Sequence, residues 1–362
     1  MSQTTIPINE NLSTQIKESI SGEEDSNFLS TCETALINSS DISFQTYLDN
    51  IKKNSTSSAC SKCYKTCSLA FKCMECQNFE DSVLCLECFL KGHHEGHNAY
   101  QILTKIGTCD CGNPAFIKPS GFCSDHKGEI SDNELTADEK STLFTIFDTL
   151  LFEITHTIPH KSPQIEAAFH WMLNLASTGD TAKRCCSLAF AKNEIDFEVL
   201  QFKLIETVNS SIAAYNDLIM SLANDPVFLE YYTKSIILFL PNYVRKLTDT
   251  LLANPRTPIE SYSLLQSNFF LAFTPFIHDI ILKDQIDWYT IFYDTTDRLL
   301  DFFKELCKYE VFSKMKAAQI FEDLMTLAKE GLKVCLIKKD NQTIANFIKR
   351  LPNSFVKYEA LF

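Results

Sequence analysis

The sequence CSKCYKTCSLAFKCMECQNFEDSVLCLECFLKGHHEGH, residues 60–97, contains seven cysteines and three histidines. Its C-x-x-C pairs, followed by H-x-x-H, have the spacing of zinc ligands. The segment has almost no long periodic apolar run, so bound metal must replace a hydrophobic core. We therefore expect a small domain that is stabilised by zinc and unfolds when its ions are removed.

More paired ligands follow this stretch. TCDCGN occupies residues 108–113 and CSDH occupies residues 123–126, so that ten of the 15 cysteines lie within residues 60–123. The first residues, MSQTTIPINENLSTQ, do not resemble a secretory signal, so we expect a reducing, intracellular environment. Zinc is therefore the stronger interpretation of the cysteines and a disulfide framework the weaker one.

The spacing yields eleven candidate metal ligands. Three tetrahedral zinc ions need twelve ligand positions, so eleven residues suffice only if one thiolate bridges two ions. Cys63 and Cys67 compete with the first cysteine of the set, and His93 breaks the H-x-x-H spacing and is expected to face solvent. The candidate ligands are Cys60, Cys73, Cys76, Cys85, Cys88, His94, His97, Cys109, Cys111, Cys123 and His126.

The net charge of the chain limits which kinds of molecule it is expected to bind. The chain has 362 residues, 45% of them hydrophobic, and a formal net charge of -13 with no basic stripe. We therefore expect no binding to nucleic acid or to anionic membrane surfaces, and a preference for cationic partners. No run of about 18 uninterrupted apolar residues occurs, which predicts a soluble protein in the cytoplasm or nucleus.

The chain divides into three parts around the cysteines. Residues 1–58 are polar and acidic and are expected to form a mobile tail. Residues 59–128 form the zinc domain with little regular secondary structure. Residues 132–362 show period-3.6 apolar patterns and predict an all-α helical bundle or irregular helical array. Helices are expected at 163–175, 197–222, 226–241, 242–253, 258–282, 287–307, 312–337 and 341–350.

The predicted helical domain begins with a capping box, Thr136 to Glu139, ahead of an amphipathic stretch to Ile154. The remaining cysteines of this part are expected to be small buried apolar residues, and its histidines to lie in the core or at the surface. Its Phe-rich faces are expected to be core, with docking of a partner helix as the alternative. These residues are Cys185, Cys186, Cys307, Cys335, His156, His160, His170 and His278.

The ordered ligand string from Cys60 to His126 resembles the UBR box, the zinc-bound recognition domain of N-recognin ubiquitin ligases in the N-degron, or N-end rule, pathway. The resemblance implies three zinc ions, with Cys88 bridging two of them. It implies one site formed by Cys73, Cys76, His94 and His97, a second formed by Cys60, Cys85, Cys88 and Cys109, and a third formed by Cys88, Cys111, Cys123 and His126.

The resemblance also implies a substrate site. The acid between the paired cysteines, Asp110, binds the α-amino group of the first residue of a substrate, helped by the backbone carbonyl of Thr108. Family members that select basic first residues have acids at the positions of Phe79 and Asn113, and both are neutral here. Glu80 and Asp81 are candidate replacements, whereas Phe79, with Tyr64 and Val83 in the pocket wall, favours an uncharged first residue.

Ligase activity itself is left open by the sequence. After His126 no Cys/His series follows that could build a RING domain, and no cysteine has the His/Asp setting of a catalytic nucleophile. The chain is therefore expected to recognise protein substrates by their free N-termini and to work with ubiquitin-conjugating and ligase machinery. The alternative is a stand-alone zinc-dependent reader or adaptor of N-termini without ligase activity.

Overall fold

The computed structural model describes most of the chain, as two compact units, Met1–Leu229 and Glu230–Phe362. The description covers residues 6–21, 27–37, 42–54, 58–60, 62–64, 68–80, 82–104, 107–128, 135–159, 162–192, 194–205, 207, 209–253, 287–293, 328–329 and 331–359.

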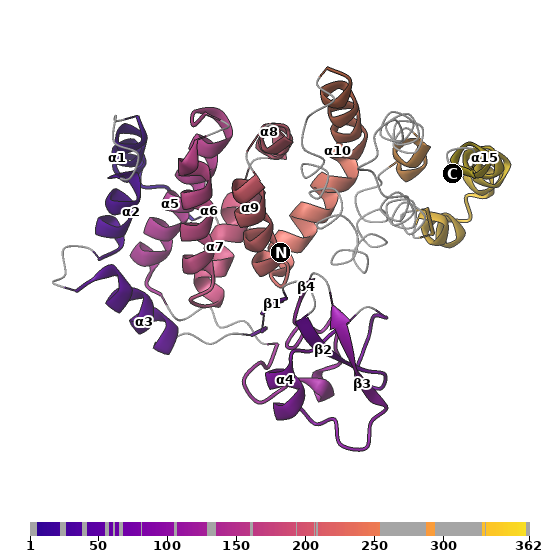
Figure 1. Ribbon diagram of the computed structural model, residues 1–362, viewed down its shortest axis with the longest axis horizontal. Helices are drawn as coiled ribbons and strands as arrows, with labels where there is room; N and C mark the ends of the chain where they lie inside the picture. Colours follow the sequence, from indigo (N-terminus) through magenta and orange to yellow (C-terminus); the bar gives the residue numbers. More distant parts are fainter. Residues whose placement is uncertain are drawn as a thin grey trace. The chain divides into compact units, whose positions relative to one another are not determined.

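The cysteine-rich segment forms a small region with two short antiparallel strand pairs (Figure 1). Strands β2 and β3 pair from Ser68↔Thr104 to Cys73↔Ala99, and β1 pairs with β4 through Cys63↔Thr108. Its elements are β1 (Cys63–Tyr64), β2 (Ser68–Cys73), α4 (Leu86–Lys91), β3 (Ala99–Thr104), β4 (Gly107–Thr108) and a 3-10 turn at Pro119–Gly121. This confirms the expected domain with little regular secondary structure.

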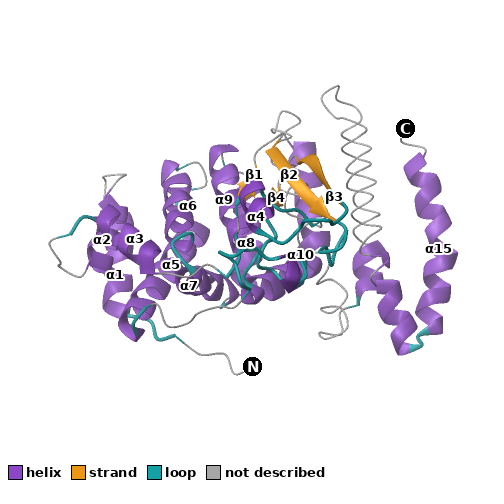
Figure 2. Cartoon of the chain, turned by 90° about the horizontal axis from the view of Figure 1, so that it is seen from below, coloured by secondary structure: helices purple, strands orange, loops and turns teal. Residues whose placement is uncertain are grey.

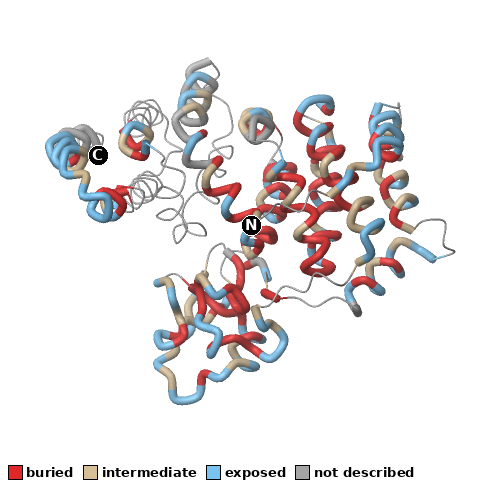
Figure 3. The backbone as a smooth tube through the Cα atoms, turned by 180° about the vertical axis from the view of Figure 1, so that it is seen from behind, coloured by how far each residue is buried: buried red, intermediate tan, exposed pale blue. Residues whose placement is uncertain are grey.

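The second part of the first unit is helical, as expected. Helix α5 begins with the predicted capping box, in which Thr136 accepts a hydrogen bond from the Glu139 N–H and the Glu139 carboxylate accepts one from the Thr136 N–H. Buried residues run along α5, α6, α7 and α9, as the burial colours of the backbone in Figure 3 show. The helices are α5 (Ala137–His156), α6 (Pro163–Ala176), α7 (Asp180–Ala191), α8 (Glu194–Ile205) and α9 (Asn209–Leu222).

Two helix boundaries differ from the sequence expectation. The pattern at 197–222 predicted one helix, but α8 and α9 are separate and Thr207 lies between them, where its hydroxyl donates to the Lys203 carbonyl. Thr favours such side-chain bonds to the backbone, which compete with the helical ladder. Pro241 was expected to end a helix, yet α10 runs through it (Pro226–Ala253). A proline removes one intrahelical hydrogen bond, and the turns on either side can continue.

The N-terminal part also differs from the expected mobile tail. It forms α1 (Glu10–Ile20), α2 (Asn27–Ile37) and α3 (Phe44–Asn54), and α1 packs against α5. The Asn9 N–H donates to Thr145 Oγ1 at 2.9 Å, and Ile16 is completely buried. Composition alone misled because the buried apolar residues of these helices lie on short faces that pack against one another and against α5. Figure 2 shows α1 and α2 beside α5.

In the second unit, aromatic side chains pack around α15 (Asn341–Glu359), which extends beyond the predicted 341–350. The Tyr293 hydroxyl donates to the Phe347 carbonyl at 3.1 Å, and the Trp288 ring lies 5.4 Å from the Phe347 ring. The expected helix 258–282, and most of those at 287–307 and 312–337, lie outside the described residues. No helix in the described part of the chain is both long and apolar enough to cross a membrane.

Candidate metal centre and neighbouring carboxylate

The structure brings all eleven candidate ligands together into three groups. Within each group the sulfur and nitrogen atoms that could hold a metal ion lie within 4.8 Å of one another. The groups are Cys73, Cys76, His94 and His97; Cys60, Cys85, Cys88 and Cys109; and Cys88, Cys111, Cys123 and His126. Since Cys88 belongs to two groups, eleven residues supply twelve ligand positions.

The first group joins the end of β2 to the loop after α4. The Nδ1 atom of His97 lies 3.4 Å from Cys73 Sγ and 3.3 Å from Cys76 Sγ, and His94 Nδ1 lies 3.5 Å from Cys76 Sγ. In a tetrahedral zinc site, bond lengths near 2.3 Å for sulfur and 2.0 Å for nitrogen place such atoms about 3.6 Å apart. The donor set and its spacing therefore fit zinc.

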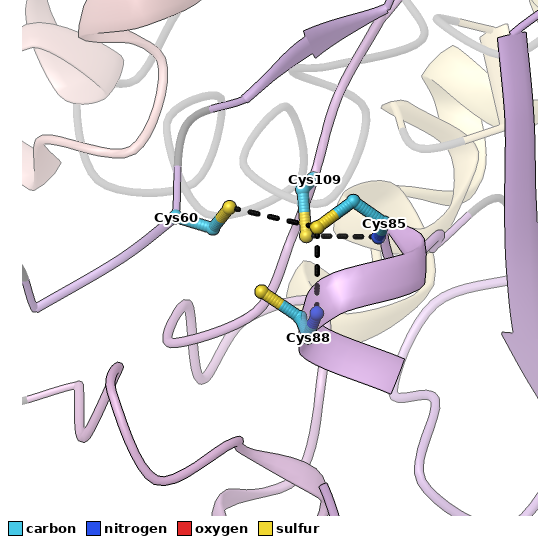
Figure 4. Close-up of side chains that lie close together, drawn as sticks. All are labelled: Cys60, Cys85, Cys88 and Cys109. Carbon is cyan, nitrogen blue, oxygen red and sulfur yellow. Dashed lines mark hydrogen bonds between the residues drawn. The ribbon is translucent and has the colours of Figure 1, made fainter. Parts of the chain in front are cut away.

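The second group is formed entirely by cysteine sulfur atoms (Figure 4). Cys60 Sγ lies 3.9 Å from Cys85 Sγ, close to the separation of about 3.8 Å between sulfur atoms on one zinc ion. The Cys85 N–H donates to Cys109 Sγ at 3.2 Å, and the Cys88 N–H donates to Cys85 Sγ at 3.5 Å. Backbone N–H groups directed at sulfur stabilise thiolates, the form that binds metal.

The third group shares its first ligand with the second. Cys88 Sγ lies 3.4 Å from His126 Nδ1, and Cys123 Sγ lies 3.0 Å from the same nitrogen. The Cys123 N–H donates to Cys111 Sγ at 3.2 Å. Cys109 and Cys111 thus face different groups, although only Asp110 separates them.

Burial and the closeness of the cysteines to one another oppose ionisation of the thiols, although metal binding requires thiolates. Burial lowers the pKa of His94, which keeps its ring neutral and able to ligate, and burial raises the pKa of Cys76 to about 12. The hydrogen bond from Cys88 lowers the pKa of Cys111 to about 4, whereas bonds to Cys109 and Cys111 raise the pKa of Cys88. Neighbouring thiols therefore share protons, and a cation is needed for all of them to ionise together.

The carboxylate of Asp110 lies beside two of the ligand groups. Oδ2 of Asp110 accepts a hydrogen bond from the Val83 N–H at 2.8 Å, and the backbone N–H of Asp110 donates one to the Val83 carbonyl at 2.9 Å. The preceding N–H, that of Cys109, donates to the Lys62 carbonyl at 2.9 Å. Asp110 is only 9% exposed, so both its backbone and its side chain have fixed positions.

The structure also describes other residues that were predicted to bind the substrate. Thr108 is in β4 and Tyr64 is in the paired strand β1, and both are buried, as is Val83. The Tyr64 hydroxyl is buried without a hydrogen-bond partner. Phe79 is half-buried and packs edge-to-face on Phe116, with ring centres 6.1 Å apart.

Several sequence candidates lie apart from these groups. His93 is exposed, as expected, and so are His156 and His170, while Cys185, Cys186 and Cys335 are buried. Glu80 is exposed, and its backbone carbonyl accepts from Lys72 Nζ. Cys63 pairs through its backbone with Thr108. Asp81, Cys67, His160, His278 and Cys307 lie outside the described residues.

Asn113 has partners that the sequence did not predict. Its Nδ2 donates to Oδ1 of Asn224, in the turn after α9, at 3.1 Å, and its Oδ1 accepts from the Ala115 N–H at 3.0 Å. Near it, the Ser58 N–H donates to Asp180 Oδ2 at 2.7 Å. The contacts with Asn224 and Asp180 join residues 111 and 122 positions apart, so no local sequence pattern could have revealed them.

Comparison with known proteins agrees with this geometry. The family model of the zinc finger in N-recognin, the UBR box, matches residues 59–126. The E3 ubiquitin-protein ligase PRT6 of Arabidopsis thaliana is 37% identical over 82 residues, the ligase UBR3 of Homo sapiens is 36% identical over 66 residues, and the ligase UBR1 of Mus musculus is 32% identical over 82 residues.

These matches are confined to one region. They cover 23%, 18% and 22% of this chain and 4%, 4% and 5% of the respective relatives. The family match thus concerns the cysteine-rich segment, and the chain spans only about a twentieth of the length of those ligases. Residues 59–126 of this chain belong to the UBR-box family of zinc fingers found in N-recognins.

Proposed function

We propose that this chain binds the free N-termini of other proteins through its UBR box, as the substrate-binding part of an E3 ubiquitin ligase of the N-end rule pathway. One observation carries the proposal: Asp110 is held between Cys109 and Cys111, which belong to different ligand groups. Metal bonds on both sides fix the backbone, so the carboxylate loses little entropy when it pairs with an ammonium group.

The domain holds three zinc ions in this proposal, and Cys88 bridges two of them. The twelve ligand positions are filled by protein side chains, which is typical of structural zinc and leaves no open position for catalysis. Eight thiolates outweigh three Zn²⁺ ions by two negative charges. This anionic platform suits a cationic ligand, and the charged α-amino group of a protein is such a ligand.

The α-amino group binds the Asp110 carboxylate and the backbone carbonyl of Thr108. A carboxylate offers about four lone-pair positions, so Asp110 can keep the Val83 N–H and still accept from an ammonium group. Because Asp110 is buried, with 9% of the residue exposed, the pairing of its carboxylate is screened little by water. Tyr64 and Val83 line the site, and Phe79 lies at its rim in this proposal.

A binding assay tests the proposal directly. We expect zinc-loaded full-length chain to bind a peptide with a free N-terminus and to lose about a hundredfold or more in affinity when that terminus is acetylated, since charge-assisted hydrogen bonds of about 1.5–3 kcal/mol each disappear. Asp110→Asn is expected to cause a similar loss with unchanged zinc content. Equal binding of free and acetylated peptides would overturn the proposal.

Two further measurements address the ions and the ligase. Elemental analysis is expected to give three zinc ions per active chain, and two or fewer would contradict bridging by Cys88. Capture of the full chain from cytoplasmic and nuclear extracts, followed by a ubiquitin-transfer assay, is expected to recover ligase activity. Peptide binding without recovered ligase activity would instead favour a stand-alone reader of N-termini.

A further inference from the structure

The loop that carries Asp110 and the segment at Ser58 each contact the helical array at one point, and both contacts lie within the unit Met1–Leu229. Asn113 Nδ2 donates to Oδ1 of Asn224 at 3.1 Å, and Asn224 lies in the turn between α9 and α10. The Ser58 N–H donates to Asp180 Oδ2 at 2.7 Å at the start of α7. Helix α9 also packs against β1 and β4.

Gly112 links these two contacts. Its φ angle is +88°, and a Cβ atom there would lie 2.0 Å from the Ser58 carbonyl oxygen, so only glycine allows so close an approach. The Cys60 N–H donates to the Cys111 carbonyl at 2.9 Å in the same place. The backbone next to Asp110 is therefore fixed by a segment that the helical array itself holds through Asp180.

Both ends of the Asn113 amide are engaged away from solvent. The nitrogen donates to Asn224, the oxygen accepts from the Ala115 N–H, and the residue is 7% exposed. The position at which basic-selecting UBR boxes have an acid thus carries a neutral side chain turned toward the helices. It provides no carboxylate for a guanidinium or ammonium group.

Asp225, which follows Asn224 in the turn between α9 and α10, cannot replace the acid that is missing at position 113. Asp225 is 4% exposed, and its Oδ2 accepts from Nε of Arg184 at 2.6 Å. Its Oδ1 accepts from the N–H groups of Val227 and Phe228 at 2.9 and 3.2 Å, at the start of α10. Both oxygens are therefore committed to the ion pair and to the helix cap.

We propose that Asn224 is a positioning residue of the N-terminus site: it holds Asn113 against the helical array, so that the site selects substrates with an uncharged first residue. This inference rests on the proposed recognition of free N-termini by Asp110. A basic first side chain brought to Asn113 would lose water without gaining a carboxylate partner, which is costly in a buried setting. An uncharged side chain avoids that loss.

Peptides that differ only at the first residue test the inference on zinc-loaded full-length chain. We expect a peptide beginning with Ala to bind at least tenfold more tightly than one beginning with Arg. Asn224→Ala should lower this Ala-to-Arg preference at least fivefold with unchanged zinc content, because Asn113 becomes free to turn toward the substrate. Asn346→Ala, at an exposed position of α15, is the matched control and should leave the preference unchanged.

The acetylated Ala peptide separates the two proposals. If it binds as well as the free peptide, recognition of the α-amino group fails. If only the free peptide binds but Arg at position one is bound as tightly as Ala, or if Asn224→Ala leaves the preference unchanged, the role of Asn224 is wrong and N-terminus recognition stands.

A second variant guards against misfolding of the first. Asn224→Asp keeps an oxygen that accepts from Asn113 Nδ2 and adds a negative charge beside the site. We expect it to improve binding of the Arg peptide about tenfold relative to the Ala peptide. An unchanged ratio in this variant would equally contradict the inference.

Discussion

The UBR box and the helices α5 to α9, here called the helical array, lie in one compact unit, Met1–Leu229, but are stabilised in different ways. In the box, seven buried cysteines and His94, which belong to three ligand groups, lie among a few buried apolar residues such as Leu84 and Ile117. In the array the buried centre consists of large apolar side chains, such as Phe147, Phe169 and Tyr215, that are fully buried. Metal–ligand bonds thus stabilise the box, whereas burial of apolar surface stabilises the array.

The difference shows that the box is built to hold a functional side chain in a fixed position, whereas the helices support it. A zinc ion fixes the backbone at a few points, so the box can hold a buried carboxylate, Asp110, within a small and irregular fold. The helices provide a surface that the loop at Asn113 contacts through the hydrogen bond from Asn113 to Asn224. Each region can therefore be disturbed by a change that leaves the other nearly intact.

Removal of zinc should have the largest effect and should be confined to the box. Structural zinc contributes on the order of 10–16 kcal/mol to folding in zinc-finger peptides, so chelation is expected to unfold residues 59–128 and abolish peptide binding. Helicity at 222 nm should stay nearly constant, because the helices α5, α6, α7 and α9 do not contain the ligands. Region-resolved hydrogen exchange measures both responses. If the amides of the box stay protected from exchange after chelation, the box is not stabilised mainly by metal.

The converse change is Phe147→Ala in α5. This side chain is fully buried, so its removal should destabilise the helical array by about 3–5 kcal/mol, the cost of a large cavity. Denaturant unfolding followed by helicity measures the loss, and zinc content should not change. Phe152→Ala in the same helix is the control, because Phe152 is 43% exposed and should cost much less. Similar losses for both variants would argue against the described core.

An intermediate effect is expected where the two regions meet. Asp180→Ala leaves the buried Ser58 N–H without its acceptor, which should cost about 1–3 kcal/mol and increase hydrogen exchange near Gly112. Asp148→Ala removes a carboxylate that pairs with Lys192 in a more exposed setting and should cost at most about 1 kcal/mol. If the two variants are equally stable, the contact between box and array carries little free energy.

The smallest effect should come from the helix cap of α5. Thr136→Ala removes both the hydroxyl acceptor and half of the capping box, with an expected loss of about 1 kcal/mol. Thermal unfolding should shift by a few degrees while zinc content and peptide affinity are retained. Thr14→Ala, at an exposed position inside α1, provides the control. A fall in zinc content in Thr136→Ala would mean that the two regions are not separable.

Much of this organisation could be predicted from local sequence patterns. Ligand spacing identified the zinc domain, and the capping box at Thr136 located the start of α5, because both depend on residues a few positions apart. The N-terminal helices were missed, since their short apolar faces gain stability from packing against one another and against α5. The division of α8 from α9, and the passage of α10 through Pro241, likewise depend on local backbone bonding and packing that periodicity does not encode.

By itself, the sequence determined the identity and number of the candidate metal ligands and the position of the carboxylate between two of them. Spacing sufficed because ligands to one ion come from short motifs with fixed geometry. Only the tertiary structure decided how Asn113 is used, because its partner Asn224 is 111 positions away and is brought near by the packing of α9. Contacts of this kind arise from folding of the whole unit, and no local pattern of residues specifies them.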